Sequence, residues 1–313
     1  MFQIADEKPI ERMAIFQSRV DNIGMCFLSY DFNNCCLVMY QPTFAKAVKN
    51  YDSHALPQGR AASRLVEQVI ETDDLKSISS IIDIGCGTAF AIKQLLNKFR
   101  DKNIVFPAEC VLVDQETLML DVASKSIREI FNVEPKCVLT DAFDSKWTGF
   151  YQKHGQTHGR RVVISSYLLQ WSKNPLDVLI KIWINLLNKG DLLVISFPDS
   201  RSFEWLRRSH MLVGLKDKSL KLFDSEELIG ANAIARLSTC YQVVSCGQDN
   251  DSVVIKQPSD YLRHFSRIGS TPSFRRYSFR EVKLILKALS FLEKSGHPCM
   301  LDYYSTWLVL KRL

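Results

Sequence analysis

The residues best suited to chemistry lie in a short run that combines a carboxylate with glycines. The run is Asp-Ile-Gly-Cys-Gly-Thr-Ala, from Asp83 to Ala89, and it follows an apolar stretch. Gly85 and Gly87 in a strand-to-helix turn let a ligand approach the backbone, and the next helix presents free N–H groups to it. Asp83 suits a ligand that carries a positive group. The fingerprint for nicotinamide dinucleotides requires a third glycine where this sequence has Phe90, so that fingerprint is excluded. The alternative is that Gly85 and Gly87 only form a strand-to-helix turn.

Two more carboxylates follow the next predicted strands. Asp114 ends the apolar run that begins at Cys110, where a carboxylate can accept hydrogen bonds from both hydroxyls of a ribose. Asp141 begins an Asp-Ala-Phe segment after a third strand, where it can accept from an adenine amino group while Phe143 covers the ring. A helix cap is the alternative for Asp141. Because ligands bind outside the carboxyl ends of the strands in an open α/β sheet, we expect these segments at one edge.

The elements that must position these residues alternate between strand and helix. Apolar runs that predict buried strands lie at residues 80–84, 110–114, 136–139, 161–165 and 191–197. Amphipathic spacing predicts helices at residues 60–71, 89–99, 117–131, 175–187 and 278–292, and a short one from Thr43 to Tyr51. Later strands are predicted at residues 240–246, 251–256 and 303–310. Repeated strand–helix units imply a parallel sheet covered by helices on both faces.

The composition is that of a globular protein, since 46% of the 313 residues are hydrophobic and 24% are charged. This length suits one large α/β domain with an elaborated lid, or two small domains. No apolar window reaches the roughly 18–20 residues needed to span a bilayer. The stretch from Ile23 to Met39 has polar breaks and lacks a signal-peptide pattern, so we expect a cytoplasmic protein.

Cysteine and charge patterns restrict the partners further. The nine cysteines form no Cys-x-x-Cys pair, which predicts free thiols in a reducing compartment and no zinc site. His154 and His158 lie four residues apart in a Gly-rich stretch, where we expect a solvated loop. The formal net charge is +6, and its basic clusters are either a solvated face or a patch for an acidic partner. No nucleic-acid motif accompanies them.

The Asp83 run, the acidic end of the second strand and the Asp-Ala-Phe segment together resemble class I S-adenosylmethionine-dependent methyltransferases. The resemblance implies a Rossmann-like α/β fold, with a mostly parallel seven-stranded sheet, helices on both faces and a helical lid or insertion. It implies S-adenosylmethionine as the cofactor and no metal. The residues that it assigns to cofactor binding are Asp83, Gly85, Cys86, Gly87, Asp114, Gln115, Asp141, Ala142, Phe143 and Ser165. Ala89 stands where the family usually has a third glycine.

Longer motifs narrow the resemblance to the malonyl-acyl carrier protein O-methyltransferases of biotin synthesis. The stretches that carry this likeness are Phe44–Ala55, Ser165–Trp171, Phe197–Leu206, Tyr261–Thr271 and Leu301–Tyr304. The similarity covers roughly residues 41–313, which implies one methyltransferase domain after an N-terminal extension, residues 1–40, of unknown role. Lid or insertion segments are expected at residues 198–236 and 258–277.

The narrower resemblance implies methyl transfer to the free carboxylate of a malonyl thioester, an early step of pimeloyl formation. A carboxylate is a sufficient nucleophile at neutral pH, since its reference pKa is about 4, so the enzyme must mainly align the reactants and exclude water. Tyr51, His54 and Arg267 are the candidates for orienting this carboxylate, with packing or surface hydrogen bonding as the alternatives. Gln170 and Trp171 are expected to line the pocket, although Trp171 equally suits a core position.

The resemblance also implies an acyl carrier protein as partner. Carrier proteins are typically acidic, so we expect docking on a basic patch that consists of Arg207, Arg208, Arg275, Arg276 and Arg280. Three other functions stay open: methylation of another small carboxylic acid, the role of a non-methylating assembly-factor relative, and binding without catalysis. No nucleic acid or membrane partner is expected.

Overall fold

The computed structural model describes residues 28–29, 38–39, 47–48, 50–72, 74–154, 159–215, 222–269, 277–297 and 300–313. Within the predicted N-terminal extension, strands β1 (Leu28–Ser29) and β2 (Val38–Met39) pair antiparallel. The rest of that extension and the predicted helix start at Thr43 lie outside the described residues.

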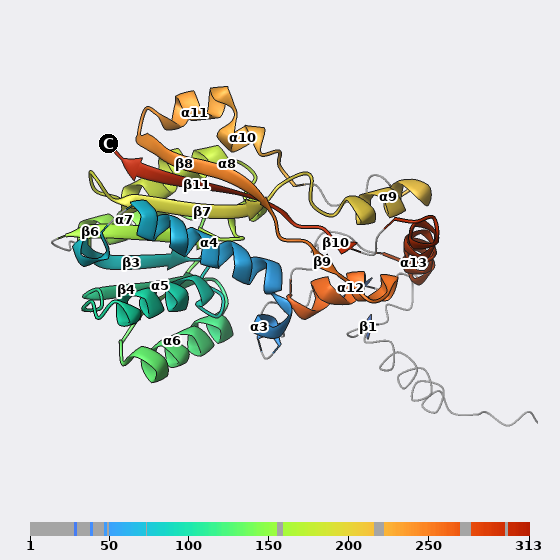
Figure 1. Ribbon diagram of the computed structural model, residues 1–313, viewed down its shortest axis with the longest axis horizontal. Coiled ribbons are helices and arrows are strands. Elements are labelled where there is room, and N and C mark those ends of the chain that lie inside the picture. Colours follow the sequence, from blue (N-terminus) through green and yellow to red (C-terminus); the bar gives the residue numbers. More distant parts are fainter. Residues whose placement is uncertain are drawn as a thin grey trace, which may run out of the picture.

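One seven-stranded sheet forms the centre of the molecule (Figure 1). Its strands are β3 (Ile78–Ile84), β4 (Glu109–Asp114), β5 (Lys136–Leu139), β6 (Arg160–Ser166), β7 (Leu192–Pro198), β8 (Tyr241–Asn250) and β11 (Tyr304–Arg312). The strand order is β5-β4-β3-β6-β7-β11-β8, and β11 runs antiparallel to both its neighbours while the other pairs are parallel. The predicted, mostly parallel sheet is therefore confirmed.

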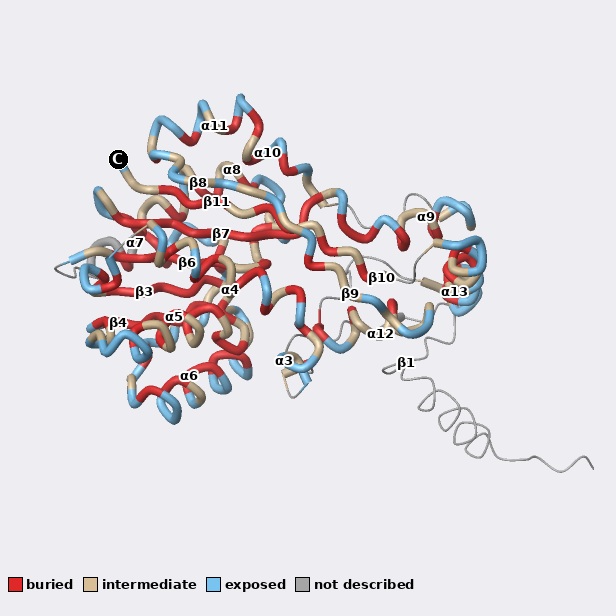
Figure 2. Tube along the Cα trace, in the orientation of Figure 1, coloured by how far each residue is buried: buried red, intermediate tan, exposed pale blue. Residues whose placement is uncertain are grey.

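Alternate residues of the central strands face two separate hydrophobic cores. Ile81 and Leu112 face a core shared with α4 (Leu56–Thr72), α5 (Phe90–Asp101) and α6 (Thr117–Phe131). Ile82 and Val113 face the opposite core. The helical segments of that core are α7 (Ser145–His154), α8 (Pro175–Asp177), α10 (Glu226–Ile229) and α11 (Ala231–Leu237). Because both faces are covered there, the parallel strands β3, β4, β6 and β7 are buried along almost their whole length (Figure 2), whereas the edge strand β5 is largely exposed.

The helical layer on this second face differs from the sequence prediction. The predicted helix at 175–187 is divided into α8, a π-helical turn, η3 (Val178–Ile182), and a 3₁₀ turn, η4 (Trp183–Leu186). The π-helical turn changes to the 3₁₀ turn at Trp183. This residue is fully buried, and its indole N–H donates to the carbonyl of Ala142 at 2.9 Å. Helix α7 was not predicted, although Trp147 and Tyr151 are buried at a spacing of four.

The predicted strand at 251–256 is reduced to β9 (Val253–Val254), which pairs with β10 (Met300–Leu301) outside the main sheet. Asp251 explains the interruption, because its buried carboxylate accepts hydrogen bonds from Ser305 and from Arg64. The main-sheet strand β8 therefore ends just before this residue, at Asn250.

Helices α9 (Glu204–Leu212), α12 (Pro258–Arg267) and α13 (Phe279–Lys294) form a group beyond the carboxyl ends of the parallel strands (Figure 1). They share a third core that is rich in aromatic residues, namely Tyr167, Phe203, Trp205, Tyr261, Phe265 and Tyr303. The segment 198–236, predicted as lid, contributes α9 to this group, whereas its second half contributes α10 and α11 to the core of the sheet.

Candidate functional site

The glycine turn between β3 and α5 is held in a left-handed backbone conformation. Gly85, Gly87 and Ala89 have φ angles of 67°, 52° and 63°. A Cβ on Gly85 would lie 2.7 Å from the side chain of Leu168, whereas a Cβ on Gly87 would meet nothing within 4 Å. The turn is therefore closed on the side of Gly85 and open over Gly87, which leaves room for a ligand against the backbone.

Asp114, at the end of β4, fixes this turn. Its carboxylate accepts the backbone N–H of Gly87 at 2.9 Å and that of Glu116 at 3.0 Å, one on each oxygen. Burial raises the pKa of Asp114, while these hydrogen bonds oppose the shift. Each carboxylate oxygen has a second lone pair, so the predicted contact with two ribose hydroxyls stays available. Gln115 is exposed beside it.

Asp83 is the most unusual carboxylate of the site. It is 2% exposed, and its Oδ2 has no hydrogen-bond partner among the described residues. Burial raises the pKa of Asp83 to about 7; the negative charge of Asp114 adds to this effect, and the backbone N–H of Ile92 and the charge of Lys93 oppose it. A buried acceptor oxygen without a donor fits a ligand that brings a positively charged N–H group.

The Asp-Ala-Phe segment makes a turn at the end of β5. The exposed Asp141 accepts the backbone N–H of Phe143 at 2.9 Å and so closes this turn. The next helix, α7, begins at Ser145, so the helix-cap alternative for Asp141 is wrong. Ala142 is buried, and its carbonyl accepts the indole N–H of Trp183. The ring of Phe143 stacks on Trp183 at 6.3 Å, with an interplanar angle of 13°. The predicted adenine contact by Asp141 and Phe143 stays a prediction.

The end of β6 supplies the next wall of the site. Ser165 is buried and donates its hydroxyl to the carbonyl of Ile84 at 2.9 Å, which joins the ends of β6 and β3. Gln170 donates its Nε2–H to the carbonyl of Tyr167 at 2.6 Å, while its buried Oε1 has no partner among the described residues. The carbonyl needs a donor, so the amide orientation is fixed and Oε1 stays open to a ligand. Trp171 is 37% exposed and so is not a core residue.

The short helix α3 (Tyr51–His54) is tied directly to the glycine turn. Asp52 accepts the hydroxyl of Thr88 at 2.5 Å and lies 3.7 Å from the ammonium of Lys93. Burial raises the pKa of Tyr51, and the nearby charges of Asp114 and Asp52 raise it further. Through the bond of Asp52 to Thr88, α3 is joined to the same turn that Asp114 holds at Gly87. Sequence reasoning missed Asp52, although it lies within the motif that carried the resemblance.

A partly buried histidine, His264, lies on the same helix as the predicted acceptor-site residue Arg267. His264 on α12 lies 2.8 Å from the hydroxyl of Tyr303 through its Nε2. Burial lowers the pKa of His264 to about 4, and the positive charges of His54 and Arg267 lower it further. Helix α3, which carries His54, contacts α12, which carries both His264 and Arg267. Sequence reasoning did not select His264. Arg267 is exposed, with no ion-pair partner among the described residues.

No family model matches the chain. A malonyl-[acyl-carrier protein] O-methyltransferase of Neorickettsia risticii is 25% identical over 244 residues, which cover 78% of this chain and 86% of the relative. A protein of the same name from Bacteroides fragilis is 23% identical over 271 residues, which cover 86% of this chain but only 49% of the relative.

Solved structures agree on the architecture. A S-adenosylmethionine-dependent methyltransferase from Anabaena variabilis superposes with a TM-score of 0.51 at 11% identity, and the match covers 93% of this chain and 98% of that one. The chain has the class I S-adenosylmethionine-dependent methyltransferase fold. In this fold, ligands bind at the carboxyl ends of the parallel strands. The features of this chain that lie there are the glycine turn, Asp83, Asp114 and the end of β6.

The described members of the predicted basic patch have different surroundings in the structure. The guanidinium of Arg207 donates to the backbone carbonyls of Ser200, Ser202 and Arg201, so it stabilises a turn. Arg208 pairs with Glu204 at 2.6 Å. Arg280 is exposed, and the remaining two members, Arg275 and Arg276, lie outside the described residues. Docking on this patch stays a prediction.

In the part of the chain that the structure describes, no group of three or more His, Cys, Asp or Glu residues could hold a metal ion. None of the helices described there is both long enough and apolar enough to cross a membrane.

The neutral state of His264 predicts a pH-dependent stability. The unfolded side chain takes up a proton near pH 6.5, whereas the folded one stays neutral down to about pH 4. The contribution is therefore complete above pH 6.5 and is lost as the pH falls through 4, by at most roughly 3 kcal/mol in the free energy of unfolding. Urea unfolding of the wild type and of His264→Gln at pH 7 and pH 4.5 measures it. An equal loss in both proteins would contradict the prediction.

Proposed function

We propose that the protein transfers a methyl group from S-adenosylmethionine to the free carboxylate of a malonyl thioester on an acyl carrier protein, as in the pimeloyl branch of biotin synthesis. Five curated relatives bear the name of this activity. The structural observation that supports the proposal is the contact of α3, which carries Tyr51 and His54, with α12, which carries His264 and Arg267. Asp52 of α3 accepts a hydrogen bond from Thr88 and so joins this pair of helices to the glycine turn.

The cofactor fits the residues that are present. S-Adenosylmethionine supplies an electrophilic methyl group on a cationic sulfur, together with an ammonium group and a ribose. The unpartnered Oδ2 of Asp83 and the open space over Gly87 suit its positively charged amino-acid end. Asp114, held on the turn by two backbone N–H groups, suits the ribose hydroxyls.

The acceptor half of the site needs no general base. An acceptor carboxylate is ionised at neutral pH, its oxygen forms the bond to the methyl carbon, and the electron pair of the broken carbon–sulfur bond stays on sulfur. The exposed Arg267 can hold the carboxylate by charge-assisted hydrogen bonds, and the raised pKa keeps Tyr51 a hydrogen-bond donor. His264 is neutral, so it orients Tyr303 without adding a second positive charge that would weaken the nucleophile.

A methyl-transfer assay on malonyl-acyl carrier protein, read by intact-protein mass, tests the proposal. We expect one methyl group on the malonyl-loaded carrier and none on the unloaded carrier. Arg267→Ala should lower kcat/KM by about 10- to 100-fold through lost alignment of the carboxylate, with the affinity for S-adenosylmethionine unchanged. Arg263→Ala on the same helix, where Arg263 pairs with Asp260, is the matched control.

Free malonate and malonyl-coenzyme A separate the acceptor classes. Faster turnover on a free acid than on the carrier would replace the proposed acceptor with another small carboxylic acid. Cofactor binding without a methylated product from any of these carboxylates would contradict the proposal.

A further inference from the structure

Helix α13 has one buried face and one strongly basic face. Its apolar residues Val282, Ile285, Ala288, Leu289 and Leu292 are buried, and the helix packs against α9 and α12. On the opposite side, Lys283, Lys287 and Lys294 follow one another at spacings of four and seven, which place them on one stripe. A shallow hollow of about 460 Å³ runs along this stripe, lined by Lys283, Leu286, Lys287, Ser290, Phe291 and Lys294.

The charge of this stripe is not neutralised within the described part of the chain. No carboxylate lines the hollow, and none of the three lysines has an ion pair with a described residue. Some exposed lysines elsewhere are paired: Lys125 pairs with Glu129 and Lys181 pairs with Asp177. An uncompensated row of positive charge raises the local concentration of acidic partners and orients them.

Aromatic rings accompany the lysines. Phe291 is 61% exposed and Phe279 is 49% exposed, and the ammonium of Lys283 lies 5.2 Å from the centre of the Phe279 ring. Single exposed apolar residues are common, but two rings on the same basic stripe provide apolar contact area between the charges. The combination fits the surface of a folded acidic protein, in which apolar side chains lie among carboxylates.

The position of α13 connects this stripe to the acceptor site. Ile285 and Leu289 on its buried face share a core with Tyr261 and Phe265 of α12, and α12 carries His264 and Arg267 (Figure 1). A protein docked on α13 would therefore sit beside the helix that holds the proposed carboxylate-binding residues. Arg280, the exposed member of the predicted basic patch, lies on the same side of α13.

We propose that the Lys283–Lys287–Lys294 stripe of α13 is the docking surface for the acidic carrier protein that presents the acceptor. The identity of the partner rests on the proposed function. The surface itself is defined by the row of lysines, the two exposed rings and the hollow between them.

The test is a triple charge reversal, K283E/K287E/K294E, in the full chain. The matched control reverses three exposed lysines away from α13, K76E/K102E/K189E, and so has the same net charge. Binding of malonyl-acyl carrier protein is measured by calorimetry at low and high salt, and kcat/KM is measured on the carrier substrate and on malonyl-coenzyme A.

We expect at least a tenfold loss of carrier affinity and of kcat/KM on the carrier in the α13 variant, a weaker salt dependence, and unchanged kinetics on malonyl-coenzyme A. The control should stay within about twofold of the wild type. Equal losses in both triple variants, or unchanged carrier binding in the α13 variant, would overturn the proposal. A changed oligomeric state of the α13 variant, with carrier binding retained, would also overturn it. Because binding is measured separately from catalysis, a wild type that binds the carrier but does not methylate it would contradict the proposed function and leave the docking surface standing.

Discussion

Replacing Asp83 with asparagine is expected to weaken S-adenosylmethionine binding by up to about 100-fold. The carboxylate is 2% exposed, and its Oδ2 has no partner among the described residues, so a cationic donor is its natural complement. A charge-assisted hydrogen bond in such a place contributes up to about 3 kcal/mol, which corresponds to roughly two decades in the dissociation constant. Titration calorimetry at pH 8 measures the change.

The same substitution should leave the fold intact or make it more stable at pH 8. Burial raises the pKa of Asp83 from 3.8 to about 7. The protonated carboxyl therefore favours the folded state below pH 4, and this contribution is lost as the pH rises through 7. Asparagine carries no charge to bury, so Asp83→Asn avoids this loss.

The exposed Asp141 provides the comparison for Asp83. Asp141→Asn should weaken cofactor binding by less than about tenfold, because water can replace its contacts. Affinity of Asp83→Asn within threefold of the wild type would remove this residue from the cofactor site. Parallel thermal unfolding at pH 5 and pH 8 shows whether a binding loss comes from unfolding.

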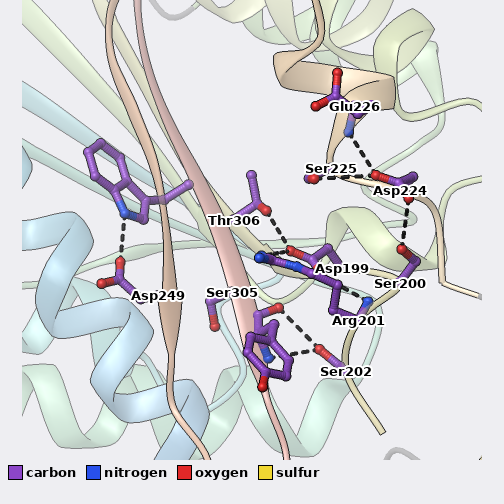
Figure 3. Close-up of polar contacts among 12 residues, drawn as sticks. Asp199, Ser200, Arg201, Ser202, Asp224, Ser225, Glu226, Asp249, Ser305 and Thr306 are labelled. Atoms are coloured by element: carbon purple, nitrogen blue, oxygen red, sulfur yellow. Dashed lines mark hydrogen bonds and ion pairs between the residues drawn. The ribbon is translucent and has the colours of Figure 1, made fainter. Parts of the chain in front are cut away.

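Replacing Asp199 with alanine is expected to lower the free energy of unfolding by about 3–5 kcal/mol. Asp199 is fully buried after β7, and its carboxylate accepts from the backbone N–H and the guanidinium of Arg201 and from the hydroxyl of Thr306 on β11 (Figure 3). Its removal leaves the buried Thr306 hydroxyl without this acceptor and detaches the turn that leads into α9. Denaturant unfolding measures the loss.

Asp224 is the control within the same region. It is exposed, and it accepts from Ser200 and from the backbone N–H of Glu226 (Figure 3). Asp224→Ala should cost less than about 1 kcal/mol, because water reaches the groups that it leaves. Equal effects of the two substitutions would show that burial of Asp199 adds nothing to its contribution.

The glycine turn is a part of the site whose position could be predicted from local sequence patterns. Gly85 and Gly87 directly follow the buried strand β3, which ends with Asp83 and Ile84. A short apolar run between helices is stable only when both of its faces are covered. The position of the turn at the carboxyl edge of a parallel sheet was therefore predictable from neighbouring residues. The helix 117–131 and the strand 136–139 were also predicted with the bounds that the structure gives.

The sequence by itself thus determined the parallel sheet, the glycine turn and the carboxylates that follow successive strands, because each depends on residues close together in the chain. Only the tertiary structure decided which distant groups meet. The bond between Asp52 and Thr88, the contact of His264 with Tyr303 and the insertion of β11 between β7 and β8 join segments tens of residues or more apart. Periodicity carries no information about such pairs, because they form where packed elements bring polar groups within hydrogen-bond distance of one another.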